Sequence, residues 1–225
     1  AVLVVILMSK MPQAKDSGGR VSLRKTFTAL LKNRRYSYGV FSLVMYMGAQ
    51  IMCWTYIYQY AEGIGIEASI AANYQLLAFI LFTIGRIIGT YLLKFINSTR
   101  LLVYFAFAGL ICALITVFGA GVLGLYALVS ISFFLSIMFP TIYGIALDGL
   151  EEEKAKIGAA GLVMAIVGGA LLPQFQGMII DLGGVGVDDI KILGVSEVKF
   201  SFLLPVICFL VVIIYGWNMV KKARS

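Results

Sequence analysis

The sequence predicts an all-α integral membrane protein, and three observations support this fold class. Hydrophobic residues make up 61% of the 225 positions and charged residues only 13%, whereas soluble domains are nearer to half apolar and about a quarter charged. The mean hydropathy is +0.97. Apolar stretches of about 20 residues, the length of a helix that crosses a bilayer, recur along the chain. We therefore expect a helical protein that crosses the membrane several times.

Six apolar segments are long enough to be full spans. They are expected at about Tyr38–Tyr60, Ser69–Leu93, Leu101–Ala120, Leu125–Leu147, Gly158–Ile180 and Lys199–Trp217. The opening stretch, AVLVVILM, is too short to cross a bilayer, and we interpret residues 1–9 as the tail of a truncated transmembrane helix. Residues 38–220 would then form the six-helix bundle, and residues 221–225 a cytoplasmic tail.

Residues 10–37 form a basic segment before the first full span. Within it, Leu23, Phe27 and Leu30 recur at helical spacing, and the basic residues occupy the other face. This pattern predicts a helix that lies on the anionic surface of the membrane. Since the membrane accounts for the positive charge, the lipid bilayer is the expected partner and nucleic acid is not.

The lysine and arginine residues determine the orientation. All but two of the 18 basic residues lie before the first span, in the connections after the second and fourth spans, or in the tail. Arg86 is assigned to the connection after the second span, and only Lys191 and Lys199 fall on the opposite side. Because cytoplasmic loops carry the excess of positive charge, both ends of the chain are expected in the cytoplasm. The membrane would be a plasma membrane or a bacterial inner membrane.

The residue types argue against an enzyme. Histidine is absent, which removes a Ser-His-Asp triad and histidine metal ligands. Cys53, Cys112 and Cys208 lie within apolar segments without metal-ligand spacing, as small buried hydrophobic residues do. The acidic residues lie in loops or at membrane edges, not at mid-depth, where they would indicate a proton relay. We expect no catalytic residue, no metal and no cofactor.

Polar and aromatic side chains form a stripe along the first span. Tyr46, Gln50 and Trp54 recur every four residues, and Tyr58 follows near the interface. In one interpretation the stripe is a sugar-binding wall, in which the Gln50 amide binds hydroxyl groups and the Trp54 indole covers the apolar side of a pyranose ring. The alternative is interhelical hydrogen bonding together with an interfacial aromatic belt. The residues alone leave both interpretations open.

Prolines and glycines are expected to disturb the fourth and fifth spans. Pro140 lacks an amide hydrogen and clashes with the carbonyl group of Ser136, which predicts a kink in mid-membrane. Pro173 affects Gly169 in the same way, and Gly168 makes that turn easier to bend. These positions are therefore candidate conformational hinges.

The fifth span combines close packing with polar side chains. Gly161, Ala165 and Gly169 form a ridge of small residues that a neighbouring backbone can approach. Gln174 and Gln176 follow in its outer half, and at least one of them is expected to face a wet interior. By contrast, the third and sixth spans have almost no polar side chains in their middles, and we expect them to face lipid on all sides.

Several stretches resemble the major facilitator superfamily. GRIIGTYLLKFINSTR (Gly85–Arg100) resembles the inner-loop motif of the family in its second-half copy, which braces the cytoplasmic ends of two helices. Resemblance to the fucose/glucose/galactose–proton symporter branch is carried by YMGAQIMCWTYIYQYA (Tyr46–Ala61) with AANY (Ala71–Tyr74), by SIMFPTIYG (Ser136–Gly144) and by GLVMAIVGGALLPQFQG (Gly161–Gly177). The similarity covers nearly the whole chain and matches only the second half of the family, spans seven to twelve.

The resemblance implies the six-helix C-terminal half of a major facilitator superfamily transporter, with the missing N-terminal six-helix half as its partner. Together with the patterns above, it gives three sets of candidate residues. The substrate-binding set is Tyr46, Gln50, Trp54, Asn73, Phe139, Gln174 and Gln176. The hinge and packing set is Pro140, Gly161, Gly168, Gly169 and Pro173. The cytoplasmic gate motif is Gly85, Arg86, Gly89, Lys94 and Arg100.

The implied function is uptake of a small neutral sugar by proton symport through alternating access, with the proton gradient as the energy source. The coupling carboxylates of the family belong to the first half, in agreement with the lack of a mid-depth acid here. A fixed charge in the spans is not expected, which favours an uncharged substrate. A transporter of another neutral solute and a six-helix channel stay open as alternatives. One departure from the family pattern is the acidic run DGLEEEK (Asp148–Lys154), interpreted as a solvated loop.

Overall fold

The structure is a computed structural model that describes residues 23–183 and 191–222. The expected helix tail at residues 1–9, the first part of the basic segment and residues 223–225 of the expected tail lie outside the described residues. In chain order the elements are α2 (Leu23–Lys32), α3 (Arg34–Thr55), α4 (Ile57–Glu62), α5 (Ala68–Leu92), α6 (Ser98–Phe118), α7 (Val122–Leu135), α8 (Met138–Leu147), α9 (Glu152–Met164), η1 (Ala165–Val167), α10 (Gly168–Ile180), η2 (Asp181–Gly183), β1 (Lys191–Ile192), β2 (Val195–Ser196), α11 (Glu197–Ser201) and α12 (Leu203–Lys222).

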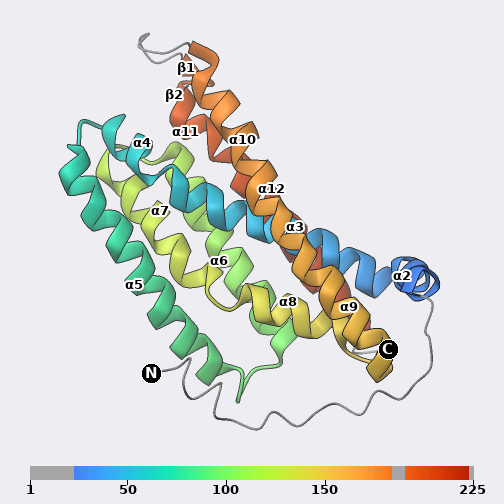
Figure 1. The fold of residues 1–225 in the computed structure, drawn as a ribbon. Helices are drawn as coiled ribbons and strands as arrows, with labels where there is room; N and C mark the ends of the chain where they lie inside the picture. Colours follow the sequence, from blue (N-terminus) through green and yellow to red (C-terminus); the bar gives the residue numbers. More distant parts are fainter. Residues whose placement is uncertain (1–22, 184–190, 223–225) are drawn as a thin grey trace, which may run out of the picture.

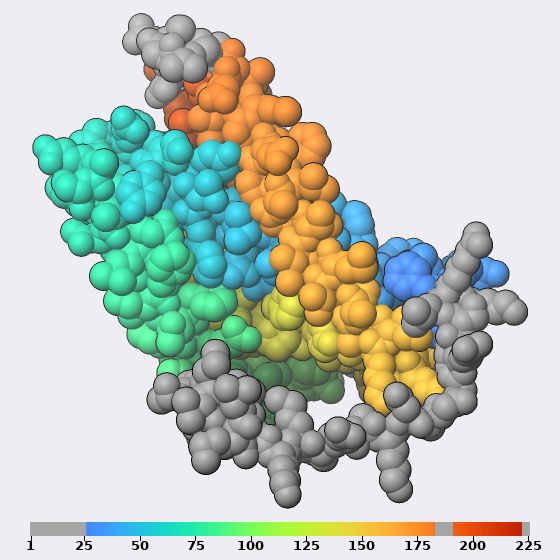
Figure 2. All heavy atoms as spheres, viewed as in Figure 1, coloured from blue at the N-terminus to red at the C-terminus, as the bar shows by residue number. Residues whose placement is uncertain are grey.

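The long helices form a bundle with α5 at one margin and α10 at the other (Figure 1). α5 packs on α7 and α4, whereas α10 packs on α3. Between these margins, α6 contacts α7 and α12, and α3 contacts α12 and α8. Figure 2 shows the same view with all atoms, in which α10 lies over α3 and α5 forms the opposite edge. Each marginal helix is therefore covered by the chain on one side only.

Within the described chain, five helical segments are long and apolar enough to cross a membrane. They are Ala68–Leu92, Ser98–Phe118, Val122–Leu147, Glu152–Ile180 and Glu197–Lys221, and they correspond to the second to sixth predicted spans. The first predicted span corresponds to α3 and α4. α3 has 22 residues, about 33 Å at 1.5 Å per residue, but its polar side chains make it less apolar than the other five. The prediction of a helical protein with several spans is confirmed.

The expectation that the third and sixth spans face lipid on all sides is wrong. Their helices, α6 and α12, pack closely against each other, because Gly109 lies against the Phe209 ring and Gly216 lies against Val103. Half of the apolar window is buried in each of these two spans, compared with 17% in α5 and 28% in the α9–α10 span. Apolar side chains pack against protein as well as against lipid, so a lack of polar residues does not identify a lipid-facing helix.

The fourth span is interrupted in the region where the sequence predicts a kink. α7 ends at Leu135 and α8 begins at Met138, two residues before Pro140. Pro140 has no amide hydrogen to donate to the carbonyl group of Ser136. The Ser136 hydroxyl donates a hydrogen bond of 2.7 Å to a different carbonyl oxygen, that of Phe133. The span therefore consists of two helices joined by an irregular turn.

The fifth span is also irregular, and its irregular turn lies just before the Gly168–Gly169 pair. The 3-10 turn Ala165–Val167 separates α9 from α10, and α10 begins at Gly168 with Pro173 in its interior. Beyond α10, strands β1 and β2 pair as a hairpin with Lys191 opposite Ser196. The sequence analysis did not predict this hairpin, since each strand has only two residues.

Glycines let α10 lie close to α3. A Cβ atom at Gly168 would clash with the carbonyl group of Val44 on α3. On the facing helix, a Cβ atom at Gly48 would lie 2.8 Å from Leu172 Cβ. Because side chains are missing on both sides of this contact, the two backbones approach each other as in other small-residue pairs of membrane helices.

We predict that Gly168→Ala destabilises the chain, because the new methyl group overlaps the Val44 carbonyl group. The cost should be about 1–3 kcal/mol, as in other overpacked contacts, and should appear as a lower unfolding temperature in detergent. Gly144→Ala in α8 is the matched control, because a Cβ atom there meets nothing within 4 Å and alanine is the better helix former. Equal unfolding temperatures for the two variants would contradict the close contact between α3 and α10.

Candidate functional site

A buried tyrosine and glutamine lie together on α3, near the middle of the α3–α4 span. The Tyr46 hydroxyl lies 2.6 Å from Gln50 Oε1 and 3.0 Å from the carbonyl oxygen of Leu135 at the end of α7. Both side chains are buried, with exposed fractions of 2% for Tyr46 and 8% for Gln50. The first span is thus joined to the break in the fourth span by a hydrogen-bonding tyrosine.

The interruption of the fourth span explains why the Leu135 carbonyl group needs this partner. In a continuous helix it would accept a hydrogen bond from the amide of Phe139, but the turn between α7 and α8 breaks the pattern. Backbone groups inside a membrane protein must find partners within the protein. The Tyr46 hydroxyl supplies one, and its single hydrogen is shared between the Leu135 carbonyl oxygen and Gln50 Oε1. Among the described residues, the amide nitrogen of Gln50 has no hydrogen-bond partner.

Aromatic rings surround this pair on the α8 side. The Phe139 ring lies 6.3 Å from the Tyr46 ring and stacks on Tyr143 at 6.0 Å, with an interplanar angle of 20°. Phe139 and Tyr143 are both partly exposed. The break in the fourth span is therefore flanked by a hydrogen-bonding amide and by aromatic faces, and no carboxylate lies among these residues.

Trp54 lies one turn further along α3 and is held by two neighbouring helices. Its Nε1 donates a hydrogen bond of 3.2 Å to the Ser132 hydroxyl on α7. Its ring makes edge contacts with Phe79 and Phe82 of α5, at 5.0 and 5.2 Å between centroids. Trp54 therefore fastens three helices together, as the interhelical interpretation expects, and keeps a partly exposed surface.

The remaining predicted substrate residues do not join this cluster. Asn73 is exposed near the start of α5, and Gln174 is exposed on α10. Gln176 is fully buried, and its Nε2 donates a hydrogen bond of 3.0 Å to the Ser201 hydroxyl of α11. The two glutamines of the fifth span thus point to different surroundings, and only Gln174 faces outward from the chain.

Four of the five predicted hinge and packing residues lie at helix contacts, and Pro140 is exposed. Gly161 lies beside the Tyr36 hydroxyl, and a Cβ atom at Gly169 would lie 2.9 Å from Ile51 Cγ1. Pro173 is buried, and its carbonyl oxygen accepts a hydrogen bond of 2.8 Å from the Tyr56 hydroxyl. The α9–α10 span is therefore attached to the first span at several levels, and Gly168 forms the closest of these approaches.

The predicted gate residues divide into two groups. Gly85 and Gly89 are buried, and Cβ atoms there would clash with the Phe133 carbonyl group and with the Ile137 side chain. The three basic residues of the motif are exposed: Arg86, Lys94 and Arg100. The glycines thus set the distance between α5 and the broken span, and the cations lie on the surface.

The assignment of Arg86 to a connection is wrong, because this residue lies within α5. Its guanidinium lies 6.0 Å from the centroid of the Phe82 ring. One fixed positive charge therefore lies within a span, contrary to the expectation. Lys94 lies 5.7 Å from the Tyr91 ring. Arg100 lies on α6, away from this group.

An ion pair at the end of the bundle escaped the sequence analysis. Arg35 Nη2 donates a hydrogen bond of 2.6 Å to Asp148 Oδ2, and Arg35 Nε donates one of 2.9 Å to the carbonyl oxygen of Ile145. The acidic side chains of this run are nevertheless exposed, 70% for Asp148 and 86% for Glu152, and Asp148 links α3 to the end of α8. The two partners are 113 positions apart, and neither residue type indicates the other.

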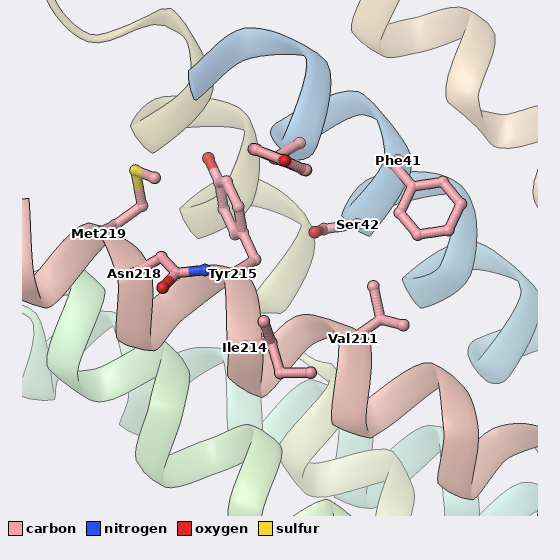
Figure 3. A pocket seen from close by; sticks show the side chains of 8 residues that line it. Phe41, Ser42, Val211, Ile214, Tyr215, Asn218 and Met219 are labelled. Carbon is pink, nitrogen blue, oxygen red and sulfur yellow. The ribbon is translucent and has the colours of Figure 1, made fainter. Parts of the chain in front are cut away.

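A separate cavity of about 310 Å³ lies between α3 and α12. Figure 3 shows that Ser42 of α3 and Tyr215 of α12 border it, among apolar side chains such as Phe41 and Ile214. The Tyr215 hydroxyl is buried and has no hydrogen-bond partner among the described residues. This cavity shares no lining residue with the cluster around Gln50.

Similar proteins and solved structures place the chain among known proteins. No family model matches it. It is 45% identical over 225 residues to the L-fucose-proton symporter of Haemophilus influenzae, 30% identical over 221 residues to that of Escherichia coli, and 27% identical over 216 residues to the glucose/galactose transporter of Brucella abortus. These matches cover 95–98% of this chain and 48–51% of the relatives, so the chain spans about half the length of the curated relatives it matches.

The fold agrees with these relationships. The chain superposes on the crystal structure of FucP, a major facilitator superfamily transporter in the outward conformation, with a TM-score of 0.79 and 29% identity. The superposition covers 97% of this chain and 51% of FucP. The chain therefore belongs to the major facilitator superfamily, in the branch of fucose–proton symporters and glucose/galactose transporters, and corresponds to the C-terminal half of its relatives.

Proposed function

We propose that this chain is the C-terminal half of a transporter that takes up a small neutral sugar by proton symport. The observation that carries the proposal is the cluster at the break in the fourth span, where the uncharged polar side chains of Tyr46 and Gln50 lie beside the Phe139 ring. The relatives support it, because they are named as fucose–proton symporters and glucose/galactose transporters. The substrate would belong to the fucose, glucose or galactose type.

The chemistry of the cluster suits a sugar. The free amide nitrogen of Gln50 offers a donor for a hydroxyl group, and the Tyr46 hydroxyl holds the amide oxygen in place at 2.6 Å. The rings of Phe139 and Trp54 offer apolar faces for the carbon–hydrogen side of a pyranose. A site that hydrogen-bonds a substrate hydroxyl discriminates strongly against analogues that lack it. Asn73, Gln174 and Gln176 would contact the substrate only if the helices move from the positions seen here.

The proton site would lie in the other half of the transporter. The acidic side chains of the described residues lie at helix ends: Glu62, Glu67, Asp148, Glu151, Glu152, Glu153, Asp181 and Glu197. None of these is placed to carry a proton through mid-membrane, where ionisable groups mark proton pathways. The proton gradient would supply the energy, and the mechanism requires no cofactor.

Alternating access would use the two irregular spans. The breaks beside Pro140 and before Gly168 interrupt the helices near positions where they contact α3, and Pro173 weakens the next turn of α10. Rocking of one half against the other around a midplane site is the behaviour of transporters with repeated halves. The N-terminal half would cover the apolar flanks that α5 and α10 expose, and Gly85, Arg86, Gly89, Lys94 and Arg100 would brace the cytoplasmic ends.

The orientation is part of the proposal. The basic segment at residues 10–37 would be the cytoplasmic connection between the halves, and residues 221–225 a cytoplasmic tail. Most of the positive charge would then lie on the cytoplasmic side of a bacterial inner membrane.

We predict that membrane vesicles containing the complete protein that carries this chain take up labelled fucose, galactose or glucose. An inward proton gradient should stimulate this uptake, and dissipating the gradient should abolish the stimulation. Uptake of one sugar that is stimulated by the gradient would identify the substrate. If folded protein took up none of the three, the sugar assignment would fail.

We also predict that Gln50→Ala weakens sugar binding about five- to tenfold, because one hydrogen bond to an uncharged group is worth about 1 kcal/mol. The fold should survive, since Tyr46 keeps its contact with the Leu135 carbonyl oxygen. Gln59→Ala, the same change at an exposed position of α4, is the control and should bind normally. Equal affinities for both variants and the wild type would show that the Tyr46–Gln50 pair is structural.

A further inference from the structure

A second surface feature lies between α6 and α12 and shares no lining residue with the cavity of Figure 3. It is a cavity of about 310 Å³ between the first turn of α6 and the last turn of α12. The lining residues are Arg100, Val103, Tyr104, Trp217, Val220 and Lys221. Because α6 and α12 run antiparallel as neighbouring spans, these two helix ends meet the same surface of the membrane.

The outer end of this cavity is positively charged. Arg100 comes from α6 and Lys221 from α12, and both side chains are exposed. None of the lining residues is acidic, and neither cation forms a salt bridge with a carboxylate in the described part of the chain. The N-terminus of α6, where the Asn97 side chain caps the Thr99 amide at 3.0 Å, adds the positive end of a helix dipole. Two unneutralised cations from different helices therefore face one opening.

The inner end of the cavity is apolar and aromatic. Tyr104 and Trp217 have exposed fractions of 60% and 56%, and such rings are enriched where a membrane meets water. The helices are close here, since a Cβ atom at Gly216 would lie 2.7 Å from Val103 Cγ2. Val103, Tyr104, Trp217 and Val220 line the part of the cavity beyond the two cations, and we call this cavity the slot.

We propose that this slot binds a phospholipid with an anionic headgroup. Its phosphate would lie between Arg100 and Lys221, and an acyl chain would run along Val103 and Trp217. Basic pockets between transmembrane helices bind anionic headgroups in this way. A soluble phosphate would use the cations but not the apolar slot. A water-soluble protein would not reach the part of the slot that lies below the membrane surface. The proposal does not depend on the identity of the transported solute.

Trp217 provides the test, because the sequence contains only two tryptophans. In the complete protein that carries this chain, with Trp54 and any tryptophan outside this sequence replaced by phenylalanine, Trp217 is the only tryptophan, and its fluorescence reports lipid in the slot. This protein is reconstituted in phosphatidylcholine vesicles that contain a minor fraction of brominated phosphatidylglycerol, which quenches tryptophan on contact. The reference vesicles contain the same fraction of brominated phosphatidylcholine. We expect the slot to prefer phosphatidylglycerol over phosphatidylcholine about 25-fold, because each of the two cations contributes a factor of about five.

Charge variants distinguish a built slot from general attraction to the membrane. Arg100→Gln and Lys221→Gln should each lower the preference for phosphatidylglycerol about fivefold, because a basic residue near the surface contributes about a factor of five to anionic lipid binding. Arg100→Lys keeps the charge and should retain most of the preference. Lys32→Gln combined with Arg34→Gln is the matched control, since both residues are exposed and lie outside the slot.

Three results would overturn the proposal. One is equal quenching by the two brominated lipids in the protein whose only tryptophan is Trp217. Another is an unchanged preference when both Arg100 and Lys221 are replaced by glutamine. The third is an equal loss of preference in the Lys32 and Arg34 control, which would show that any basic residue on this side of the membrane has the same effect.

Discussion

The hydrogen bonds of the Tyr46 hydroxyl are the contacts on which the rest of this half depends. Inside a membrane a broken helix exposes backbone carbonyl groups that water cannot satisfy, and each unsatisfied group costs several kcal/mol. The Leu135 carbonyl group is such a group, and the Tyr46 hydroxyl lies 3.0 Å from its oxygen. The same hydroxyl lies 2.6 Å from Gln50 Oε1. The break in the fourth span and the orientation of the amide are thus parts of one arrangement, in which a tolerated irregularity creates a polar site.

Close packing complements this arrangement. On one side, Gly168 brings α10 close to α3, and on the other, Gly85 brings α5 close to α7. Both marginal helices approach the central spans closely at these glycines, and on the α5 side the Trp54 ring adds contacts with Phe79 and Phe82. Such contacts leave the outer flanks of α5 and α10 uncovered by the chain. A half built in this way has a firm interior and two apolar margins, which suits a partner that has to move against it.

Much of this architecture could be predicted from the sequence. Hydropathy and the length of the apolar runs located the spans, and Pro140 located the break, because these signals are local along the chain. The pairing of helices could not be predicted in the same way. Apolar surfaces of α6 and α12 look alike to protein and to lipid, and the contact of Trp54 with Ser132 joins residues 78 positions apart. Gln176 shows the same limit, since a buried amide and a substrate-facing amide are indistinguishable in a sequence. The sequence assigns Arg86 to a loop because a charged residue near the end of an apolar run is usually expected outside the helix.

The most direct test is a structure of the complete protein with its transported sugar bound. We expect sugar density at the break in the fourth span, with a hydroxyl group within hydrogen-bond distance of Gln50 Nε2 and a ring face against Phe139 or Trp54. Sugar bound only by residues of the other half, with the Tyr46–Gln50 pair out of contact, would contradict this expectation.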